Sequence, residues 1–572
     1  MIKKRFVFLL VFSIFFGFIN SGFGNAFPRG FYKNPNKSEV LSGLNAVCRQ
    51  AEKGAFNGRD IMPMVYCFAR MLQIYPDLTK DYKDLARKVA KTGFSLVVLA
   101  MGKAGTLQAR QALAELKKEF PERAKVIKQA ESQKKVDITD FEQDPDVLWI
   151  EFFITGNKEI VHKVINLWLS DDIVAQRIAR LYVYYRGHPD KRIVNLLKQL
   201  DIKVDKSGHI VSDEDIDLKL LDMLKGEDRD FRSRQKQEAA RQLLLGLRID
   251  DKSKEFKRIV AKSSAKWSLE TNARYSKDVR EICESYINRI DERKHKISML
   301  RLLARVYADM PQDKDSRAKF LGLLQRLKSY TPDDGYLYYV TAQDCINRLD
   351  VPCLRNQMLV LQRVDKQMFS QLKTTGDWLI KALEYGGFEV NGSNAEIDIQ
   401  KAIDANRFRK RYRADAILVN SSIPIGQFGA LEAMASIQFL PDLEAEMQGK
   451  VFDGTGYLFI SCRRKADDLF SVEGSRQAPI KKDSAQYKTA MEMLDNFSLQ
   501  GLIRALSNAK LIASVKDNGK IVLKFQDRDG DYINIWVNPD TLYFERFIVH
   551  NSPSGSLRAV VSFWEQKGDN SK

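Results

Sequence analysis

Residues that commonly do chemistry in proteins are few and scattered in this sequence. The five histidines lie far apart and show none of the paired spacings that bind zinc. The chain has no HExxH helix, no phosphate-binding glycine loop and no nucleophile elbow. Asp527, Asp529 and Asp531 resemble the start of a calcium loop, but Tyr532 stands where that loop needs glycine, so we predict a hairpin turn. The sequence therefore predicts no catalytic residue, no metal site and no cofactor.

A cluster of cations stands out at 407–413, where five basic residues alternate with two aromatic ones. If this stretch is helical, Arg407, Lys410 and Arg411 lie on one face by the i, i+3, i+4 rule. Such a face could bind anionic headgroups at about 1 kcal/mol per charge, or it could be an ordinary solvated helix face. The candidates for contact with an anionic surface are Arg407, Arg409, Lys410, Arg411 and Arg413.

Two pairs of cysteines are candidates for disulfides. Cys48 and Cys67 lie on helical stretches at similar distances from the turn around Gly54–Gly58, and Cys345 and Cys353 flank a shorter turn in the same manner. The alternative for each pair is a role as small, buried apolar residues. Two further cysteines, at 283 and 462, are predicted to be free.

The N-terminus has the features of a secretory signal. Lys3, Lys4 and Arg5 precede an apolar run from Phe6 to Ile19, and small residues follow up to Ala26. The run is shorter than the ~20 residues that span a bilayer, so we expect cleavage of residues 1–26 rather than an anchor. The formal net charge of +18 then falls to about +15, which would attract the exported chain to anionic envelope surfaces. Nucleic acid is an unexpected partner in that compartment, and the surplus could equally serve solubility.

Elements that could position a site fall into two kinds. Residues 27–386 show helical periodicity almost throughout, with stops such as Gly156 and Gly187 and a capping pattern at 212–215. We expect stacked antiparallel helix pairs without a fixed repeat length. The segment 333–368 is similar in proportions to a tetratricopeptide pair. Residues 387–426 are expected to be a linker with a basic helix at about 395–415, and 567–572 a disordered tail.

The segment 427–566 is expected to be an α+β domain. Strands are predicted at about 443–451, 457–461, 469–472, 511–515, 521–525, 532–537, 542–549 and 557–564, because apolar and polar residues alternate there between Gly and Asp turns. A helix is expected at 484–507, with an apolar stripe that must pack against the sheet. The predicted fold is thus an all-α helical-repeat region followed by an antiparallel, half-barrel-like sheet.

This C-terminal segment resembles the lipoprotein carriers of the Gram-negative periplasm, which sort outer-membrane lipoproteins. The resemblance lies in Gly429–Met434 with Ile437, expected to be a short helix before the first strand, in Leu499 to Leu506, and in the hairpin 511–525. It continues through the strand INIWV, the turn 538–542 and the final Phe563-Trp564. In that family the concave sheet face binds acyl chains. The resemblance therefore implies lipid-binding roles for Tyr457, Phe459, Phe470, Trp536, Phe544 and Trp564, which could otherwise be ordinary sheet core.

The leading hypothesis is a non-enzymatic, exported envelope protein. Its helical region would bind envelope proteins, and its sheet domain would bind a lipid or a lipidated peptide, with peripheral contact to an anionic membrane. A purely structural scaffold without a ligand is the main alternative. A hydrolase of envelope polymers, with a site built from scattered carboxylates, is the weaker one.

Overall fold

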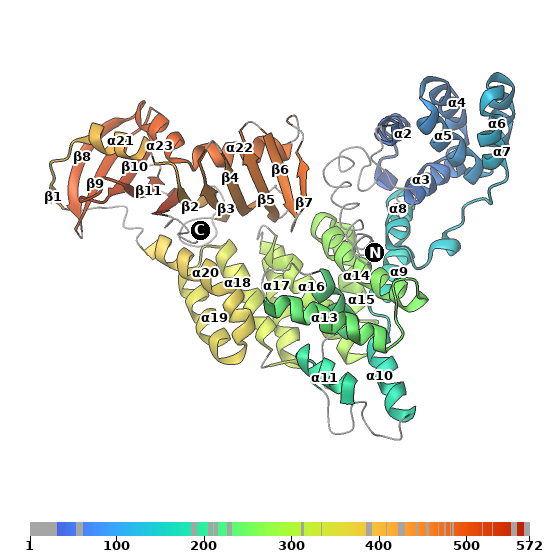
Figure 1. Cartoon of the computed structure of the whole chain (residues 1–572), viewed down its shortest axis with the longest axis horizontal. Helices are drawn as coiled ribbons and strands as arrows, with labels where there is room; N and C mark the ends of the chain where they lie inside the picture. Colours follow the sequence, from blue (N-terminus) through green and yellow to red (C-terminus); the bar gives the residue numbers. More distant parts are fainter. Residues whose placement is uncertain are drawn as a thin grey trace. The chain divides into compact units, whose positions relative to one another are not determined.

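The computed structural model describes residues 31–565 except 53–60, 185–190, 204–209, 211–214, 226–230, 311–313, 333, 385–391, 408, 421–429, 442–443, 453–456, 467, 474–475, 481, 483–484, 518, 529 and 551–556. The chain divides into two compact units, Met1–Arg289 and Ile290–Lys572 (Figure 1). The expected signal segment, the tail 567–572 and the stop at Gly187 lie outside the described residues. Within the described part, every helix is too short or too polar to cross a bilayer.

The described part of the first unit consists of helices, with single 3-10 turns between some of them. Its helices are α2 Lys37–Glu52, α3 Ile61–Ile74, α4 Thr79–Lys88, α5 Lys91–Ala104, α6 Leu107–Glu119, α7 Ala124–Glu131, α8 Pro145–Thr155, α9 Lys158–Trp168, α10 Ile173–Tyr184, α11 Lys191–Gln199, α12 Ile216–Lys225, α13 Phe231–Gly246, α14 Lys254–Tyr275 and α15 Lys277–Ile287.

Helix α8 shows how the sequence sets the bounds of these helices. It begins after Asp144, whose carboxylate accepts hydrogen bonds from the backbone N–H groups of Asp146 and Val147. It ends at Gly156, where φ is +67°, a left-handed conformation that glycine adopts without strain. A Cβ atom at this position would lie 2.5 Å from the ring of Tyr32. The predicted helix stop at Gly156 is therefore confirmed, with two separate reasons for glycine.

The second unit combines helical hairpins with one large sheet. Its helices are α16 Arg293–Ala308, α17 Lys314–Tyr330, α18 Gly335–Asn347, α19 Val351–Val364, α20 Lys366–Glu384, α21 Ile399–Arg407, α22 Ala485–Asn496 and α23 Leu499–Leu506. Its strands are β1 Ser393–Asn394, β2 Tyr412–Asn420, β3 Ala430–Phe439, β4 Ala445–Phe452, β5 Tyr457–Lys465, β6 Asp468–Glu473, β7 Arg476–Pro479, β8 Lys510–Asp517, β9 Lys520–Gln526, β10 Tyr532–Val537, β11 Phe544–His550 and β12 Leu557–Glu565.

All strand pairs of this sheet are antiparallel, in the order β1-β8-β9-β10-β11-β12-β2-β3-β4-β5-β6-β7. The sheet does not close, because β1 and β7 are separate edges. An all-helical region followed by an open, half-barrel-like antiparallel sheet is the predicted fold class, which the structure confirms.

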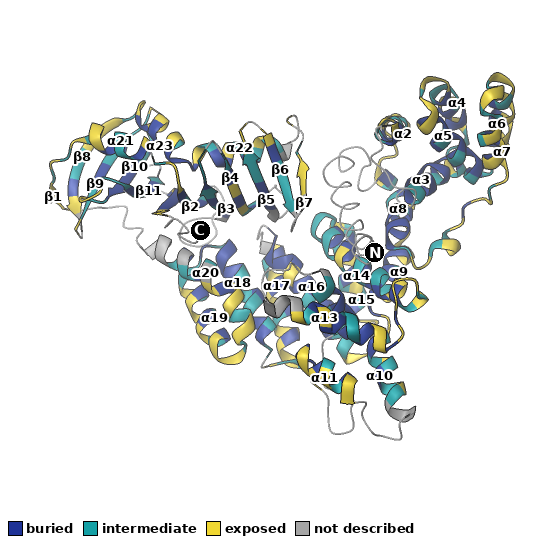
Figure 2. Cartoon of the chain, in the orientation of Figure 1, coloured by how far each residue is buried: buried dark blue, intermediate teal, exposed yellow. Residues whose placement is uncertain are grey.

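Each face of the sheet is covered by its own set of helices (Figures 1 and 2). Side chains alternate between the two faces of a strand, so a central strand such as β2 or β10 supplies residues to both cores. One core joins the sheet to α21, α22 and α23 and includes Leu494, Phe497 and Leu502. The other joins it to α18, α19 and α20 and includes Leu354, Leu361 and Leu379. The second unit begins at Ile290, so α16–α20 belong to the same unit as the sheet, whereas the sequence suggested a boundary at 386.

Three expected helices differ from the observed structure. The segment Gly429–Met434 is not a short helix, since Ala430–Phe439 forms β3. The basic helix expected at 395–415 ends at Arg407, and β2 begins at Tyr412. The helix expected at 484–507 is divided between α22 and α23. The division is fixed by Ser498, whose hydroxyl accepts the N–H of Gly501 at 2.9 Å, and by the Tyr412 hydroxyl, which accepts the N–H of Leu499 at 2.9 Å.

The turn between β9 and β10 is a hairpin, as predicted for the aspartates at 527–531. The Asp531 N–H donates to the Asp527 carboxylate at 2.8 Å, and the Asp527 N–H donates to the Asp531 carbonyl at 2.9 Å. Asp527 therefore closes a turn next to Gly530, where φ is +87°.

Candidate functional site

A cavity of about 430 Å³ lies in the second unit between the sheet and helices α16, α18 and α20. This volume is within the range of sites that bind small molecules, roughly 300–1,000 Å³. The lining residues come from six elements or the turns that follow them and are Arg305, Ala308, Asp309, Tyr336, Tyr339, Val340, Gln343, Ile346, Gln371, Leu372, Thr375, Arg413, Asp415, Met434, Ala435, Ser436, Gln448, Gly449 and Lys450.

The floor of the cavity is part of a row of polar residues that crosses six neighbouring strands. We call this set the polar row; its members are successive cross-strand partners, namely Arg546, Ser562, Asp415, Ser436, Gln448 and Ser461. Partners directly opposite each other point to the same face of a sheet, so the row forms one polar band. Asp415 and Ser562 are buried on this face. Polar groups at the centre of a sheet are costly unless they have partners, and Asp415 has one in Arg413.

Lys450 lies one step along the strands from the polar row. Its cross-strand neighbours on the same face are Met434 on β3 and, beyond it, Ile417 on β2, so its surroundings within the sheet are apolar. The whole residue is only 5% exposed, although it lines the cavity. Burial therefore lowers the pKa of the Lys450 amine to about 8, while the nearby carboxylate of Asp309 acts in the opposite direction.

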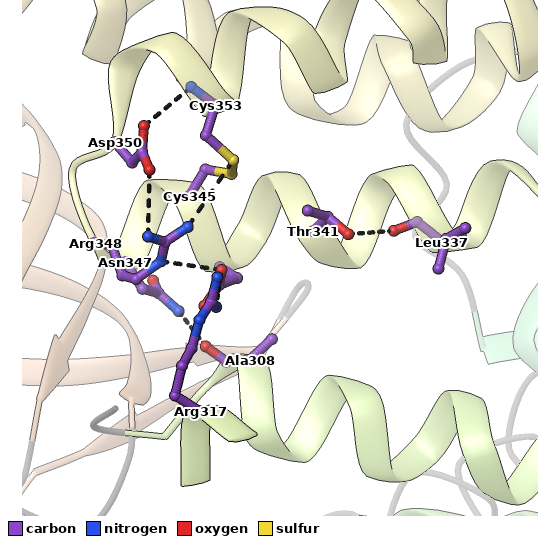
Figure 3. Close-up of polar contacts among 10 residues, drawn as sticks. Ala308, Arg317, Leu337, Thr341, Cys345, Asn347, Arg348, Asp350 and Cys353 are labelled. Carbon is purple, nitrogen blue, oxygen red and sulfur yellow. Dashed lines mark hydrogen bonds and ion pairs between the residues drawn. A yellow bond between two sulfur atoms is a disulfide. The ribbon is translucent and has the colours of Figure 1, made fainter. Parts of the chain in front are cut away.

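An asparagine from the helical side holds the Lys450 amine. The Nζ atom donates to Oδ1 of Asn347 at 2.5 Å. The amide nitrogen of Asn347 in turn donates to the backbone carbonyl of Ala308, at the end of α16, at 2.8 Å (Figure 3). This second bond fixes which end of the amide faces the lysine. The pair connects β4 to α18 across the wall of the cavity.

The cavity carries more basic than acidic groups. Arg305, Arg413 and Lys450 contribute three positive charges, and Asp309 and Asp415 contribute two negative ones. Arg413 forms an ion pair with Asp415 at 2.8 Å from Nε to Oδ1. Since Asp415 is thus compensated, the remaining balance favours an anionic ligand over a cationic one.

Only some of the predicted lipid-binding aromatics can be placed, and they do not share a face. Trp536 belongs to the core under α18–α20 and lies 5.7 Å from the guanidinium carbon of Arg546. Phe544 belongs to the opposite core, under α21–α23. Trp564 is 48% exposed and Phe470 is half-buried. The side chains of Tyr457 and Phe459 lie outside the described residues. Trp536 and Phe544 therefore lie on opposite faces of the sheet, and the lipid-binding role of the six aromatic residues stays a prediction.

The apolar stripe of the helices at 485–506 packs into the sheet. Leu494, Phe497, Leu499, Leu502, Ile503 and Leu506 are all buried there. Several sheet residues opposite them are alanines, among them Ala414, Ala433 and Ala435. Small side chains allow a helix to approach a sheet closely. On this face the described side chains form a packed core.

The basic residues at 407–413 do not form one cationic face, because the helix ends within them. Arg407 remains on α21 beside Asp404, and Arg413 points into the cavity from β2. Arg409 lies 4.8 Å from the ring of Tyr543 and donates to the backbone carbonyl of Phe544 at 3.3 Å. Lys410 and Arg411 lie between the two elements, and Arg411 is exposed. The predicted helix face that carries Arg407, Lys410 and Arg411 together is therefore wrong.

One of the two predicted disulfides is present in the structure, and the other is not. Cys345 on α18 and Cys353 on α19 form a disulfide with 5.9 Å between their Cα atoms (Figure 3). Cys48 and Cys67 are free and buried in the core of the first unit. The thiol of Cys48 instead points at the backbone carbonyl of Gly93, 3.7 Å from its oxygen. Cys283 and Cys462 are free, as predicted.

Three carboxylates in the first unit lie close enough to bind a metal ion, but they already have protein partners. Asp217 accepts the N–H groups of Ile173 and Val174 at 2.8 and 2.9 Å and so caps α10. Asp172 accepts the N–H of Ile216 at 2.5 Å and so caps α12. The buried Lys262 ammonium forms ion pairs with Asp215 and Asp217. The cluster is therefore a reciprocal helix cap, and sequence reasoning found only the part of it at the start of α12.

Asp146 is a second buried carboxylate in the first unit, and it predicts a dependence of stability on pH. Burial, with the charge of Asp144 nearby, raises its pKa to about 8, and its Oδ1 has no hydrogen-bond partner. In the unfolded chain the pKa is about 3.9, so between these values the folded state retains a proton that the unfolded state releases. The free energy of unfolding should therefore fall as pH rises from about 4 to 8.

We expect Asp146→Asn to remove about 1–2 kcal/mol of this decline, because the amide is neutral at every pH. Urea unfolding at pH 5 and pH 8 measures the difference. Asp140→Asn, at an exposed carboxylate paired with Lys134, is the matched control and should leave the decline unchanged. An equal pH dependence in the wild type and Asp146→Asn would show that Asp146 is charged in the folded state.

No protein-family profile matches the chain, and no curated protein matches it.

Proposed function

We propose that this chain is an exported, non-enzymatic binding protein whose second unit holds a small anionic group in the cavity above the polar row. The observation that carries the proposal is the buried Lys450 amine at the wall of a cavity with a polar floor. Burying a cation is costly, and an anionic ligand in the cavity would add to the compensation that the nearby Asp309 carboxylate provides. The helical first unit would bind envelope proteins, in line with its array of helix pairs.

The anionic group could be carried by a lipid headgroup or by a soluble phosphate ester. The lipid source keeps the resemblance to lipoprotein carriers, but with the headgroup rather than the acyl chain as the recognised part. Export remains part of the proposal, supported by the signal-like residues 1–26 and by the disulfide, which forms in oxidising compartments. A hydrolase has less support, because Asp415 in the cavity is neutralised by Arg413.

Binding of glycerol 3-phosphate to the full chain without residues 1–26 tests this proposal by calorimetry. We expect Lys450→Met to weaken binding at least tenfold, about 1.4 kcal/mol, since methionine keeps the length and removes the charge. Lys510→Met is the matched control, because Lys510 is exposed at the start of β8, and its affinity should equal that of the wild type.

Two vesicle compositions distinguish the sources of the anion. Binding to phosphatidylglycerol vesicles but not to phosphatidylcholine vesicles, lost in Lys450→Met, would identify a lipid headgroup. Binding to glycerol 3-phosphate alone would identify a soluble ester. If neither binds, or if Lys450→Met binds both as the wild type does, the proposal is wrong and the ligand-free scaffold is favoured.

A further inference from the structure

A second row of side chains crosses the sheet beside the polar row, on the same face. We call it the outer row; its members are successive cross-strand partners on β12, β2, β3, β4, β5 and β6, namely Trp564, Arg413, Gln438, Glu446, Arg463 and Phe470. On β12 to β5 each member lies two positions from a member of the polar row, and residues two apart on a strand point to the same face. Because neighbouring strands are ~4.8 Å apart, the outer row is about 24 Å long.

The helices α18–α20 pack on the other side of the polar row. Their core takes sheet residues such as Ile417, Met434 and Val560, which are cross-strand partners one step beyond the polar row in the opposite direction. In the outer row Trp564 and Glu446 are exposed, and the four other members are half-buried. A ligand can therefore reach the row from solvent. Since Arg413 also lines the cavity, the outer row is continuous with the cavity floor.

The charged members of the outer row are compensated by neighbouring groups. Arg413 forms an ion pair with Asp415 at 2.8 Å. Arg463 pairs with Glu444 and Glu446, at 3.1 and 3.5 Å. Because each arginine is thereby neutralised, the row favours a neutral ligand over an anionic polymer. An arginine has five N–H donors and a carboxylate accepts several hydrogen bonds, so these paired side chains keep groups that can bond to hydroxyls.

We propose that the outer row binds an extended, neutral oligosaccharide. Sugar hydroxyls both donate and accept hydrogen bonds, which matches the arginines, the glutamate and the glutamine of the row. Sugar rings also present C–H groups on their faces, and these pack against aromatic side chains such as Trp564 and Phe470, which stand at the two ends of the row. A length of about 24 Å suits a chain of several sugars rather than a single one. The inference goes beyond the anion site and does not involve Lys450.

Calorimetry with three neutral five-sugar oligosaccharides, chitopentaose, cellopentaose and maltopentaose, tests the proposal on the full chain without residues 1–26. We expect at least one of them to bind saturably and roughly tenfold or more tightly than its monosaccharide, because one sugar contacts only part of the row. Its affinity should be the same at low and at high salt, since a neutral ligand loses no attraction when charges are screened.

Trp564→Ala should weaken the binding of that oligosaccharide roughly tenfold, because it removes the exposed indole at one end of the row. Trp267→Ala is the matched control, since Trp267 is 46% exposed on α14 in the first unit, and its affinity should equal that of the wild type. Glu446→Ala is a second variant at an exposed position and should weaken binding severalfold. Urea unfolding should show that all three variants fold.

The proposal is overturned if none of the three oligosaccharides binds, or if the folded Trp564→Ala variant binds them as the wild type does. Binding to phosphatidylglycerol vesicles that depends on Trp564, without binding of any oligosaccharide, would assign the row to a lipid surface instead. Trp564→Ala should bind glycerol 3-phosphate as the wild type does. If glycerol 3-phosphate binds and the oligosaccharides do not, only this inference fails; in the reverse case only the anion site fails.

Discussion

Replacing Lys262 by alanine is expected to lower the free energy of unfolding of the first unit by about 3–5 kcal/mol. The lysine is 1% exposed on α14, and its amine donates to the carbonyl of Ser170 at 2.7 Å. It also lies beside two carboxylates, Asp215 and Asp217, at 3.7 Å from the second. Without the ammonium, these carboxylates would remain next to Asp172 with no compensating charge.

The expected loss should grow with pH. Burial and the charge of Asp172 raise the pKa of Asp217 to about 7, even though Lys262 lowers it. Below this pKa the carboxyl of Asp217 can take up a proton, which reduces the repulsion between the carboxylates. Above it Asp217 stays charged and the repulsion remains. Urea unfolding of the Lys262→Ala variant should therefore show a larger deficit at pH 8 than at pH 5.

Lys134→Ala provides the control for the deficit. Its side chain is 77% exposed and pairs with Asp140, so its removal should lower the free energy of unfolding far less than Lys262→Ala does. A loss of less than 1 kcal/mol in Lys262→Ala would mean that the three carboxylates are neutral or hydrated without it. The reciprocal cap between α10 and α12 would then need another explanation.

The network around Lys262 also shows the limit of sequence reasoning in the first unit. The capping pattern at 212–215 is local, and Asp215 does precede α12, where its side chain accepts the N–H of Leu218 at 3.2 Å. The contributions of Asp172 and Lys262 come from residues more than 40 positions away. Local patterns reveal helix ends, but the partners of a buried charge depend on packing between helices.

In the second unit, the alternation of apolar and polar residues predicts most strands. Two strands rich in alanine, β2 and β3, are not predicted in this way. Several strands from β4 onwards, such as β10 and β12, carry apolar residues at every second position, a pattern that sequence reasoning detects. In β3 the residues facing the core under α21–α23 include Ala433, Ala435 and Ile437, and in β2 they include Ala414 and Ala416. Alanine favours helices when considered locally, so these stretches were assigned to helices or a linker. Close packing against α21–α23 explains the small residues.

The cavity could not be predicted from the sequence, because its floor depends on the register of the sheet. The members of the polar row, such as Asp415 and Gln448, are separated in sequence and meet only through β2, β3 and β4. Lys450 appeared as one lysine among many, and its burial follows from the covering helices. A usable signal was present in β2, where Arg413 and Asp415 alternate with alanines and one polar face is implied.

The second large effect concerns the disulfide that joins α18 to α19. We expect the double variant Cys345→Ala/Cys353→Ala to lower the free energy of unfolding of the second unit by about 2–2.5 kcal/mol. The two cysteines are eight positions apart, and closing so short a loop removes a limited amount of entropy from the unfolded chain. The native turn keeps its own support, because the Asp350 carboxylate accepts the N–H of Cys353 at 3.0 Å (Figure 3).

Hydrogen exchange of peptides covering 335–364, compared with and without a reductant, would locate this loss. The wild type should exchange faster in these peptides after reduction, and the double variant should not respond. Cys283→Ala removes a buried thiol that is not in a disulfide, so this control should respond to the reductant as the wild type does. Because Asn347 lies two residues after Cys345 and orients Lys450, the loosened hairpin should also weaken the binding of glycerol 3-phosphate severalfold. Unchanged exchange in 335–364 after complete reduction would mean that the hairpin is held by its apolar core alone.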